Sequence, residues 1–356
     1  MHNTLKGRGA KLNPKNRFEK LTISYDENTD EVFEDENFPE RKIPTIFFKD
    51  NSKTIIAVND SDDLGFNYSI NPYRGCEHGC IYCYARPSHE YLGFSSGIDF
   101  ETKIMVKEDA PQLLEKTFQK KSYKPDVIVL SGNTDCYQPV ERKLKITRGI
   151  LKTCLDYRHP ISVITKNGLV LRDIDILQEL AALNLTTVTI SITTLNKELT
   201  SNMEPRTATP QLRLKTVEEL VKNNIPAGVN VAPIIPGLND EEIPAILKEA
   251  SLRGASYAGH IIVRLPYANK DLFVDWLNKQ YPGKAGKILN RIRDVRGGKL
   301  SSAEWGKRFS GEGEIAEAIH KLFKISCKKY GLNKPRFDLT TDLFRRKTSE
   351  QIELFN

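Results

Sequence analysis

The sequence predicts an α/β protein built on a partial (β/α)6 barrel, TIM-like in arrangement, with an extension at each end. Six short runs rich in Val, Ile and Thr recur through the middle of the 356-residue chain, as expected of buried parallel strands. Amphipathic helix patterns lie between them, and from the second run onward the spacing is roughly 30 residues, the length of one βα unit. Such barrels carry their chemistry at the carboxyl ends of the strands, so the polar residues after each run are candidates for a site.

The elements of this barrel follow in chain order. The predicted strands are Phe66–Asn71, Val127–Ser131, Ile161–Thr165, Thr187–Ile192, Ala227–Ala232 and His260–Arg264. Helices are predicted between them at 109–121, 140–157, 173–183, 209–223 and 240–253. Two of the helices carry start signals, because Asp109 and Thr209 can each cap a first turn that contains proline.

The two ends of the chain differ from the middle. Residues 1–65 are expected to form an extension that is partly disordered at its start, with strand-like runs at Thr45–Phe48 and Thr54–Val58. The barrel is predicted to span residues 66–281. Residues 282–356 are expected to form a basic, largely helical appendage that includes a helix near Glu314–Lys329.

Charge and hydropathy restrict the compartment and the partners. No apolar run approaches the roughly 20 residues of a membrane span, and the polar start lacks the apolar region of a secretory signal. A cytoplasmic protein without a membrane partner is expected. The net charge is +7, and the stretch Gly283–Arg308 holds eight basic residues against two acidic ones. Such blocks can attract nucleic acid, although a solvated basic surface is the alternative.

Three of the six cysteines are clustered in a C-x3-C-x2-C motif made by Cys76, Cys80 and Cys83. In a reducing compartment, clustered cysteines more often bind metal than form disulfides. Three thiolates on one loop can hold three irons of a [4Fe–4S] cluster and leave one iron open to an outside ligand. Gly75 and Gly79 would let the backbone turn tightly around the cluster.

This motif resembles the signature of the radical S-adenosylmethionine (SAM) superfamily. The resemblance implies a barrel of the radical SAM type and two cofactors, a [4Fe–4S] cluster and SAM. It implies that the open iron chelates SAM, that Tyr82 lies beside the adenine, and that a flavodoxin or ferredoxin supplies electrons. Reductive cleavage of SAM would then give a 5′-deoxyadenosyl radical that abstracts a hydrogen atom from the substrate.

A zinc site is the alternative interpretation of the motif. The three cysteines with His78 or His89 could form a Cys3His site, and the chain would then be a zinc-stabilised nucleic-acid-binding protein without redox chemistry. Zinc loops more often pair two C-x2-C units across a long gap. The position of the motif directly after the first predicted strand also favours the cluster.

Polar residues after the second strand form the next candidate site. The segment Thr134-Asp-x-Tyr-Gln-Pro-x-Glu141 resembles the subgroup that includes spore photoproduct lyase and its relatives, and it lacks the more common Gly-Gly-Glu form. By this resemblance, the residues expected to orient the SAM amino group are Gly132, Asn133, Thr134 and Asp135. A capped turn that enters the next helix is the alternative.

The later strand ends supply further candidates for SAM. By resemblance to the lyase subgroup, Lys166 is expected to pair with its carboxylate and Ser191 to bond to its ribose or carboxylate. An exposed residue on a loop is the alternative for each. Glu204 could take the ribose hydroxyls and Arg206 a carboxylate, with a cap or a simple ion pair as the alternative. Asn230 begins a segment that resembles the family's support for adenine. Arg264 is expected to point toward the substrate.

Cys136 is a further candidate, because a thiol near SAM could return a hydrogen atom to a product radical. A small buried core residue is the more common fate of a free cysteine. The segments Asn13-Pro-x-x-Arg-Phe18 and Ser69-Ile-Asn-Pro-Tyr-Arg-Gly-Cys76 also resemble an uncharacterised radical SAM family. The sequence thus predicts a lyase-like or related radical SAM enzyme whose substrate is a nucleic acid or, alternatively, a peptide or small molecule.

Overall fold

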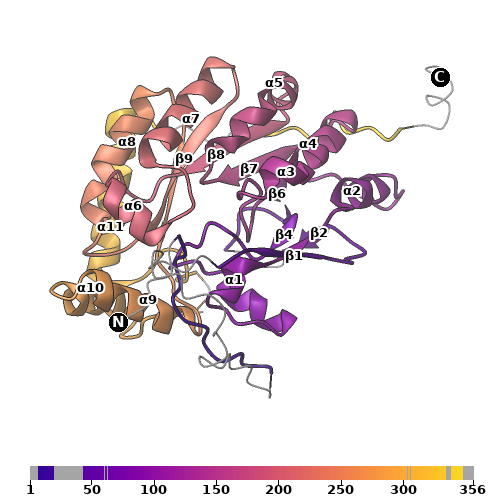
Figure 1. Cartoon of the computed structure of the whole chain (residues 1–356). Coiled ribbons are helices and arrows are strands. Elements are labelled where there is room, and N and C mark those ends of the chain that lie inside the picture. Colours follow the sequence, from indigo (N-terminus) through magenta and orange to yellow (C-terminus); the bar gives the residue numbers. More distant parts are fainter. Residues whose placement is uncertain are drawn as a thin grey trace, which may run out of the picture.

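A seven-stranded sheet forms the centre of the computed structural model, which describes residues 7–19, 43–59, 61, 63–302, 304, 306–333 and 338–347 (Figure 1). Its strands, in spatial order, are β10 (Ala258–Ile262), β9 (Ala227–Ile234), β8 (Thr186–Ser191), β7 (Ile161–Thr165), β6 (Ile128–Leu130), β3 (Tyr68–Ile70) and β2 (Ile56–Val58). Neighbours from β3 to β10 run parallel, and β2 pairs antiparallel with β3 at the edge.

The six parallel strands coincide with the six predicted ones. The sheet begins at β10 and ends at β2, so it forms a partial barrel. Every residue of β8 is buried, which explains why its sequence is a continuous run of Val, Ile and Thr and does not alternate with polar residues.

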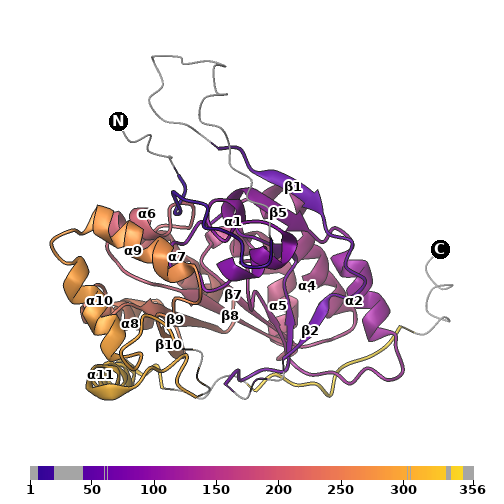
Figure 2. The ribbon, with the colours of Figure 1, turned by 90° about the horizontal axis from the view of Figure 1, so that it is seen from below.

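Helices cover the outer side of the sheet (Figures 1 and 2). They are α2 (Ala110–Phe118), α3 (Glu141–Leu144), α4 (Ile146–Asp156), α5 (Ile174–Ala182), α7 (Pro210–Lys222) and α8 (Ile243–Leu252), with a short 3-10 turn η3 (Asp240–Glu242) before α8. The helix predicted over 140–157 is therefore two helices, separated at Lys145, whose φ of +53° is left-handed.

The two predicted helix starts behave differently. The Thr209 side chain accepts a hydrogen bond from the Leu212 amide and caps α7 as predicted. The prediction that Asp109 caps α2 is wrong, because its side chain makes no capping bond. Its backbone (φ −85°, ψ 15°) is not in the extended region that capping needs, and its carboxylate lies 3.7 Å from Lys49 Nζ.

A second, three-stranded sheet lies beside the barrel. One of its strands matches the predicted run Thr45–Phe48, whereas the other two strands and their pairing were not predicted. The sheet pairs β5 (Lys103–Val106) with β1 (Ile46–Lys49) and β4 (Tyr73–Arg74). The 3-10 helix η1 (Arg86–Leu92) and helix α1 (Asp99–Thr102) lie between β4 and β5 in the chain. This small sheet and its helices carry the cysteine loop.

The C-terminal part adds helices to the other end of the sheet. The remaining helices are η2 (Gly168–Asp173), α6 (Lys197–Met203), α9 (Asn269–Gln280), α10 (Ala285–Asp294) and α11 (Gly313–Tyr330). The helix predicted near 314–329 is α11, which packs on α8 and β10. Within the described residues, no helix is long and apolar enough to cross a membrane.

The N-terminal segment 7–19 packs against the region of η1 and α1. The Arg8 guanidinium donates to the Glu101 carbonyl (2.8 Å), and the Ile98 amide donates to the Leu12 carbonyl (3.2 Å). Ala10 is fully buried. Partial disorder was predicted within residues 1–65, and residues 1–6, 20–42, 60 and 62 of this range lie outside the described residues.

Candidate functional site

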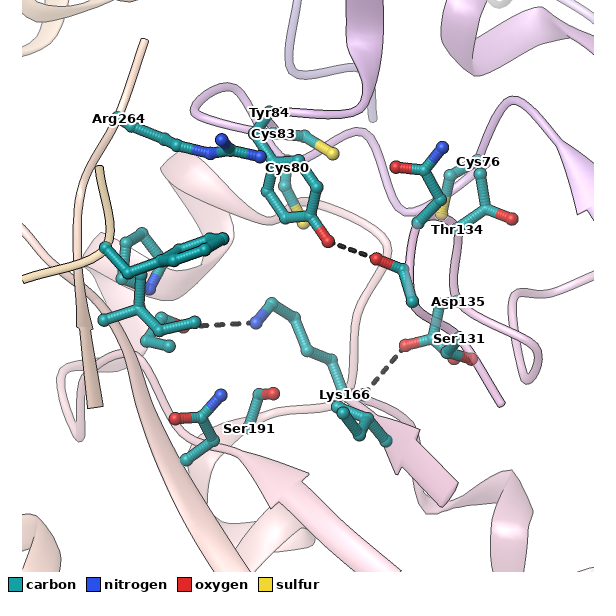
Figure 3. Close-up of a pocket in the computed structure, with 18 of the residues that line it drawn as sticks. Cys76, Cys80, Cys83, Tyr84, Ser131, Thr134, Asp135, Lys166, Ser191 and Arg264 are labelled. Atoms are coloured by element: carbon teal, nitrogen blue, oxygen red, sulfur yellow. Dashed lines mark hydrogen bonds between the residues drawn. The ribbon is translucent and has the colours of Figure 1, made fainter. Parts of the chain in front are cut away.

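The three clustered cysteines lie on one loop between β4 and η1. Cys76 and Cys80 are buried, Cys83 is half-buried, and none forms a disulfide. All three line a cavity of about 490 Å³ at the carboxyl ends of the barrel strands. Figure 3 shows their side chains at the top of this cavity, above Lys166 and Ser191. Burial raises the pKa of the Cys80 and Cys83 thiols, an effect that the charge of a bound metal would oppose.

Two glycines shape the cysteine loop. Gly75 and Gly79 have φ values of +82° and +67°, which favour glycine. A Cβ on Gly79 would lie 2.6 Å from a Glu101 carboxylate oxygen, and one on Gly75 would lie 2.9 Å from the Phe100 carbonyl oxygen. Both positions therefore need glycine for two reasons, the backbone conformation and the lack of space.

A buried ion pair between Arg86 and Glu101 supports the cysteine loop. Arg86 is fully buried and donates to the Cys80 carbonyl (3.0 Å), to the Gly79 carbonyl (3.2 Å) and to the Glu101 carboxylate (2.5 Å). The same carboxylate accepts the backbone amides of Gly9 and Ala10. One residue of α1 thus connects the N-terminal segment to the cysteine loop.

The segment after β6 holds the loop from the other side. The Gln138 side chain accepts from the Glu77 amide (2.8 Å) and donates to the Gly75 carbonyl (3.3 Å), and the Val140 amide donates to the Glu77 carboxylate (2.7 Å). Glu141 accepts from the Tyr73 hydroxyl. The Tyr-Gln-Pro-x-Glu segment therefore has a structural role at this site, because its hydrogen bonds hold the cysteine loop in place.

Within the same segment, the four residues predicted to orient the SAM amine all line the cavity, namely Gly132, Asn133, Thr134 and Asp135. The Asn133 and Thr134 amides donate to the Asn71 side chain (2.8 and 3.2 Å), which fixes the turn. These residues therefore form a hydrogen-bonded turn, as the alternative interpretation expected, and they also line the cavity.

Asp135 lies at the base of the cavity in a charged pair with His78. The two side chains are 3.4 Å apart, and Asp135 also accepts from the Thr165 hydroxyl (2.7 Å) and the Lys166 amide (2.8 Å). Burial by itself would raise the pKa of Asp135, but the nearby His78 holds it at about 2. In turn, Asp135 overcomes the effect of burial on His78 and raises its pKa to about 10.

Lys166, Ser191 and Asn230 lie together on the adjacent strands. All three line the cavity, and Ser191 pairs with Asn230 in the register of β8 and β9. The Lys166 ammonium donates to the Ala232 carbonyl (3.2 Å), as Figure 3 shows, and burial lowers its pKa to about 8. This side of the cavity thus offers a cation, a hydroxyl and an amide.

Glu204 and Arg206 do not line the cavity, contrary to the prediction that they contact SAM. Glu204 is fully enclosed and accepts from the Arg213 guanidinium and from the hydroxyls of Tyr82 and Thr193. Arg206 lies 3.3 Å from the Glu77 carboxylate. The ion-pair alternative therefore describes both residues better, and Glu204 fixes Tyr82, whose ring does line the cavity.

Cys136 is also absent from the cavity wall. Its exposed fraction is 0%, it belongs to the main hydrophobic core, and burial raises its pKa well above the usual value. The side chain therefore lies in the core, as the alternative interpretation expected, and the role of its thiol as a hydrogen donor stays a prediction.

The site geometry agrees with a comparison against protein families. A family described as the Radical SAM superfamily matches residues 70–250, which include all three cysteines and the carboxyl ends of four further strands of the barrel, β6 to β9. The chain belongs to the radical SAM superfamily. The uncharacterized protein Rv2578c of Mycobacterium tuberculosis is 32% identical over 240 residues, which cover 67% of this chain and 69% of that protein.

Solved structures show the same fold. Spore photoproduct lyase complexed with dinucleoside spore photoproduct superimposes with a TM-score of 0.58 and 16% identity, over 80% of this chain and 78% of that one. A variant of that lyase with bound AdoMet and dinucleoside spore photoproduct gives the same TM-score and coverage. The chain therefore has the α/β architecture of spore photoproduct lyase.

The radical SAM cofactors, a [4Fe–4S] cluster and SAM, fit the residues present. Three free thiols on one glycine-shaped loop face the same cavity as a cation, a hydroxyl and an amide. In the part of the chain that the structure describes, no three His, Cys, Asp or Glu side chains are placed to hold a single metal ion. A Cys3His zinc site needs such an arrangement, whereas a cluster spreads its cysteines over several irons. The zinc alternative is not supported.

Several residues of the radical SAM cavity were not predicted. Tyr84, Arg308 and Phe309 line it, and His78 is part of its base. The Tyr84 hydroxyl donates to the Gly132 carbonyl, and its position directly after Cys83 is the one sequence signal that could have identified it. Arg308 and Phe309 come from a loop beyond α10, and only the basic run Gly283–Arg308 indicated this region.

Proposed function

We propose that Cys76, Cys80 and Cys83 hold the [4Fe–4S] cluster of this radical SAM enzyme and that SAM lies between the cysteine loop and the strand ends. The observation that carries the proposal is that one cavity brings together the three thiols and the polar groups of β7, β8 and β9. When bound, the cluster and SAM supply a 5′-deoxyadenosyl radical that abstracts hydrogen from the substrate.

The chain's own residues would orient the cosubstrate. Lys166 places a cation where the SAM carboxylate can pair with it, and Ser191 and Asn230 offer hydrogen bonds beside it. Tyr82 presents its ring to the adenine, and Glu204 acts as a positioning residue because it holds the Tyr82 hydroxyl. The turn of Gly132, Asn133, Thr134 and Asp135 lines the side of the cavity where the amine is proposed to lie.

An anaerobic experiment tests this assignment. The reconstituted wild-type protein is expected to bind about four iron atoms per chain and to release 5′-deoxyadenosine from SAM and dithionite. Cys76→Ala should lose most of this iron and the product. Cys154→Ala is the matched control, because Cys154 is a fully buried core residue far from the wall and its loss should leave the iron content unchanged. Equal iron in both variants would overturn the proposal.

The substrate class is proposed from the charge at the cavity. Arg264 and Arg308 line it, and a basic block precedes Arg308 in the sequence, which supports a nucleic acid as the substrate of a lyase-like or related reaction. Salt-sensitive binding of an oligonucleotide is the expected result. Binding that does not weaken with salt, or no binding, would favour a peptide or small molecule.

An electron donor and a cellular location follow from the proposed chemistry. One-electron reduction of the cluster needs a donor, for which we propose a flavodoxin or a ferredoxin. A reducing compartment keeps the cluster thiols free, which supports a cytoplasmic location. Reduction of the cluster by purified flavodoxin, followed by its visible absorbance, would test the first of these proposals.

A further inference from the structure

Arg264 carries a guanidinium that has no polar partner in the described part of the chain. It follows β10 and lines the cavity, and its Nε is buried without a hydrogen-bond acceptor. No carboxylate lies within ion-pair distance of it among the described residues. Arg264 is half-buried, and its buried Nε is a charged donor whose desolvation is costly without an acceptor, which indicates that its partner is a group supplied from outside the chain.

Two aromatic rings hold this guanidinium in place. Its Cζ lies 4.6 Å from the centre of the Tyr84 ring and 5.0 Å from that of Phe309. Contacts with ring faces stabilise the cation, but they do not satisfy its N–H donors, which point outward in the guanidinium plane. Arg264 is thus positioned by its neighbours while its hydrogen-bonding capacity stays unused.

The other charged groups of the wall do not compensate it. Asp135 is engaged with His78, Thr165 and the Lys166 amide, and Figure 3 shows it on the other side of the cavity from Arg264. Arg308 also lies near Arg264, but its charge is balanced by Asp63 (2.8 Å), so Asp63 is not left over to balance Arg264. The nearby Cys83 thiol is proposed to hold iron. This end of the cavity therefore has an excess of positive charge.

We infer that the Arg264 end of the cavity binds an oxyanion of the substrate, a phosphate or a carboxylate, beside the Tyr84 ring. Two oxygens of such a group match the two parallel donors of a guanidinium. The inference rests on the proposed function in one respect: SAM is taken to lie at Lys166, on the other strands, so that the anion at Arg264 belongs to the substrate.

Titration of the cluster-loaded, SAM-saturated protein with inorganic phosphate, and separately with acetate, tests this inference. Ionic strength is kept constant with chloride, and binding is followed by calorimetry. Saturable binding of at least one ion is expected, and the tighter one identifies the anion. Arg264→Gln should weaken that binding by about tenfold or more, equivalent to about 1.4 kcal/mol. Lys279→Gln, on the exposed face of α9, removes the same charge and should bind like the wild type.

Several results would overturn the inference. They are the absence of binding of either ion to the wild type, equal binding by Arg264→Gln, and loss of bound SAM from Arg264→Gln, which would assign this residue to SAM. If Arg264→Gln fails to fold, Arg264→Lys decides instead, and it should bind several-fold more weakly because lysine lacks the fork. Failure of the proposed function would appear separately, as anion binding without any 5′-deoxyadenosine.

Discussion

At the scale of single residues, Gln138 joins two loops that are 61 positions apart. Its side chain is buried and bonds to both the Glu77 amide and the Gly75 carbonyl, on either side of Cys76. Gln138→Ala would leave both of these buried groups without a partner, at a cost of about 1–3 kcal/mol each before relaxation.

We expect Gln138→Ala to lower the melting temperature and to reduce the iron retained after anaerobic reconstitution and desalting. Gln178→Ala removes an exposed glutamine on α5 and serves as the control. If both variants keep the same iron content as the wild type, Gln138 does not support the cysteine loop.

A second residue, His159, makes the stability of the fold depend on pH. Its Nδ1 lies 2.9 Å from the Pro160 carbonyl and its Nε2 lies 2.8 Å from the Tyr123 hydroxyl, so the neutral ring donates through Nδ1 and accepts through Nε2. Burial lowers the pKa of His159 to about 4. The unfolded chain, with a pKa of about 6.5, therefore takes up the proton first as the pH falls.

The contribution of His159 is accordingly complete above pH 6.5 and is lost as the pH falls toward 4, by about 1–3 kcal/mol. We expect His159→Gln to flatten the dependence of the melting temperature on pH in this range. His260, whose pKa is also lowered to about 4, should leave part of the slope in place. An unchanged slope would contradict this account.

At the scale of elements, the N-terminal segment 7–19 closes over the cysteine loop. A Cβ on Gly9 would lie 1.7 Å from the Gly79 carbonyl oxygen, so the two backbones touch directly. Gly9→Ala should push the segment away from the loop and admit oxygen to the cluster. We expect the visible absorbance of the cluster to bleach several-fold faster in air than that of the wild type.

Gly286→Ala provides a control for that experiment. Gly286 lies in α10, and a Cβ there has nothing within 4 Å. Alanine also favours a helix over glycine. Equal bleaching of the Gly9 and Gly286 variants would show that the segment does not protect the cluster.

The sequence predicted some elements much better than others. The strands of the barrel were predicted because each is a continuous apolar run followed by a helix, a pattern that neighbouring residues encode. In the small sheet, only the run Thr45–Phe48 was predicted. The other two strands and the pairing were missed because the strands are short and pair over long distances, with Ile46 opposite Lys103. A pairing of this kind leaves no local periodicity in the sequence.

At the site, a position after a predicted strand indicated correctly which side chains line the cavity. It did not indicate which residues those side chains bond to. Lys166, Ser191 and Asn230 follow that rule and line the cavity. Glu204 obeys the same rule, yet the Arg213 guanidinium, from the next helix, encloses its carboxylate. Arg308 reaches the cavity from beyond the last strand, and no pattern in the sequence places that loop.

At the scale of the whole molecule, the segment 338–347 packs against helices from the first half of the chain. Arg346 donates to the carbonyls of Phe118 (3.2 Å) and Tyr123 (2.9 Å), and the Arg345 amide donates to the Tyr157 carbonyl (3.0 Å). The Phe344 ring packs edge-on against Phe118. The last described segment thus covers the C-terminal ends of α2 and α4.

We expect Phe344→Ala to destabilise the protein by about 1–2 kcal/mol, less than for a fully buried ring because Phe344 is half-buried. Denaturant unfolding measures this change. The iron content should stay at the wild-type level, because this contact lies outside the cavity wall. A loss of iron in this variant would indicate that the two regions are coupled.

The cysteine loop is held by Glu101, Arg86 and Gln138, none of which needs a metal to make its contacts. We therefore expect the loop to keep its conformation in the metal-free chain. Iron and sulfide could then be inserted, and inserted again after damage by oxygen, without refolding of the polypeptide.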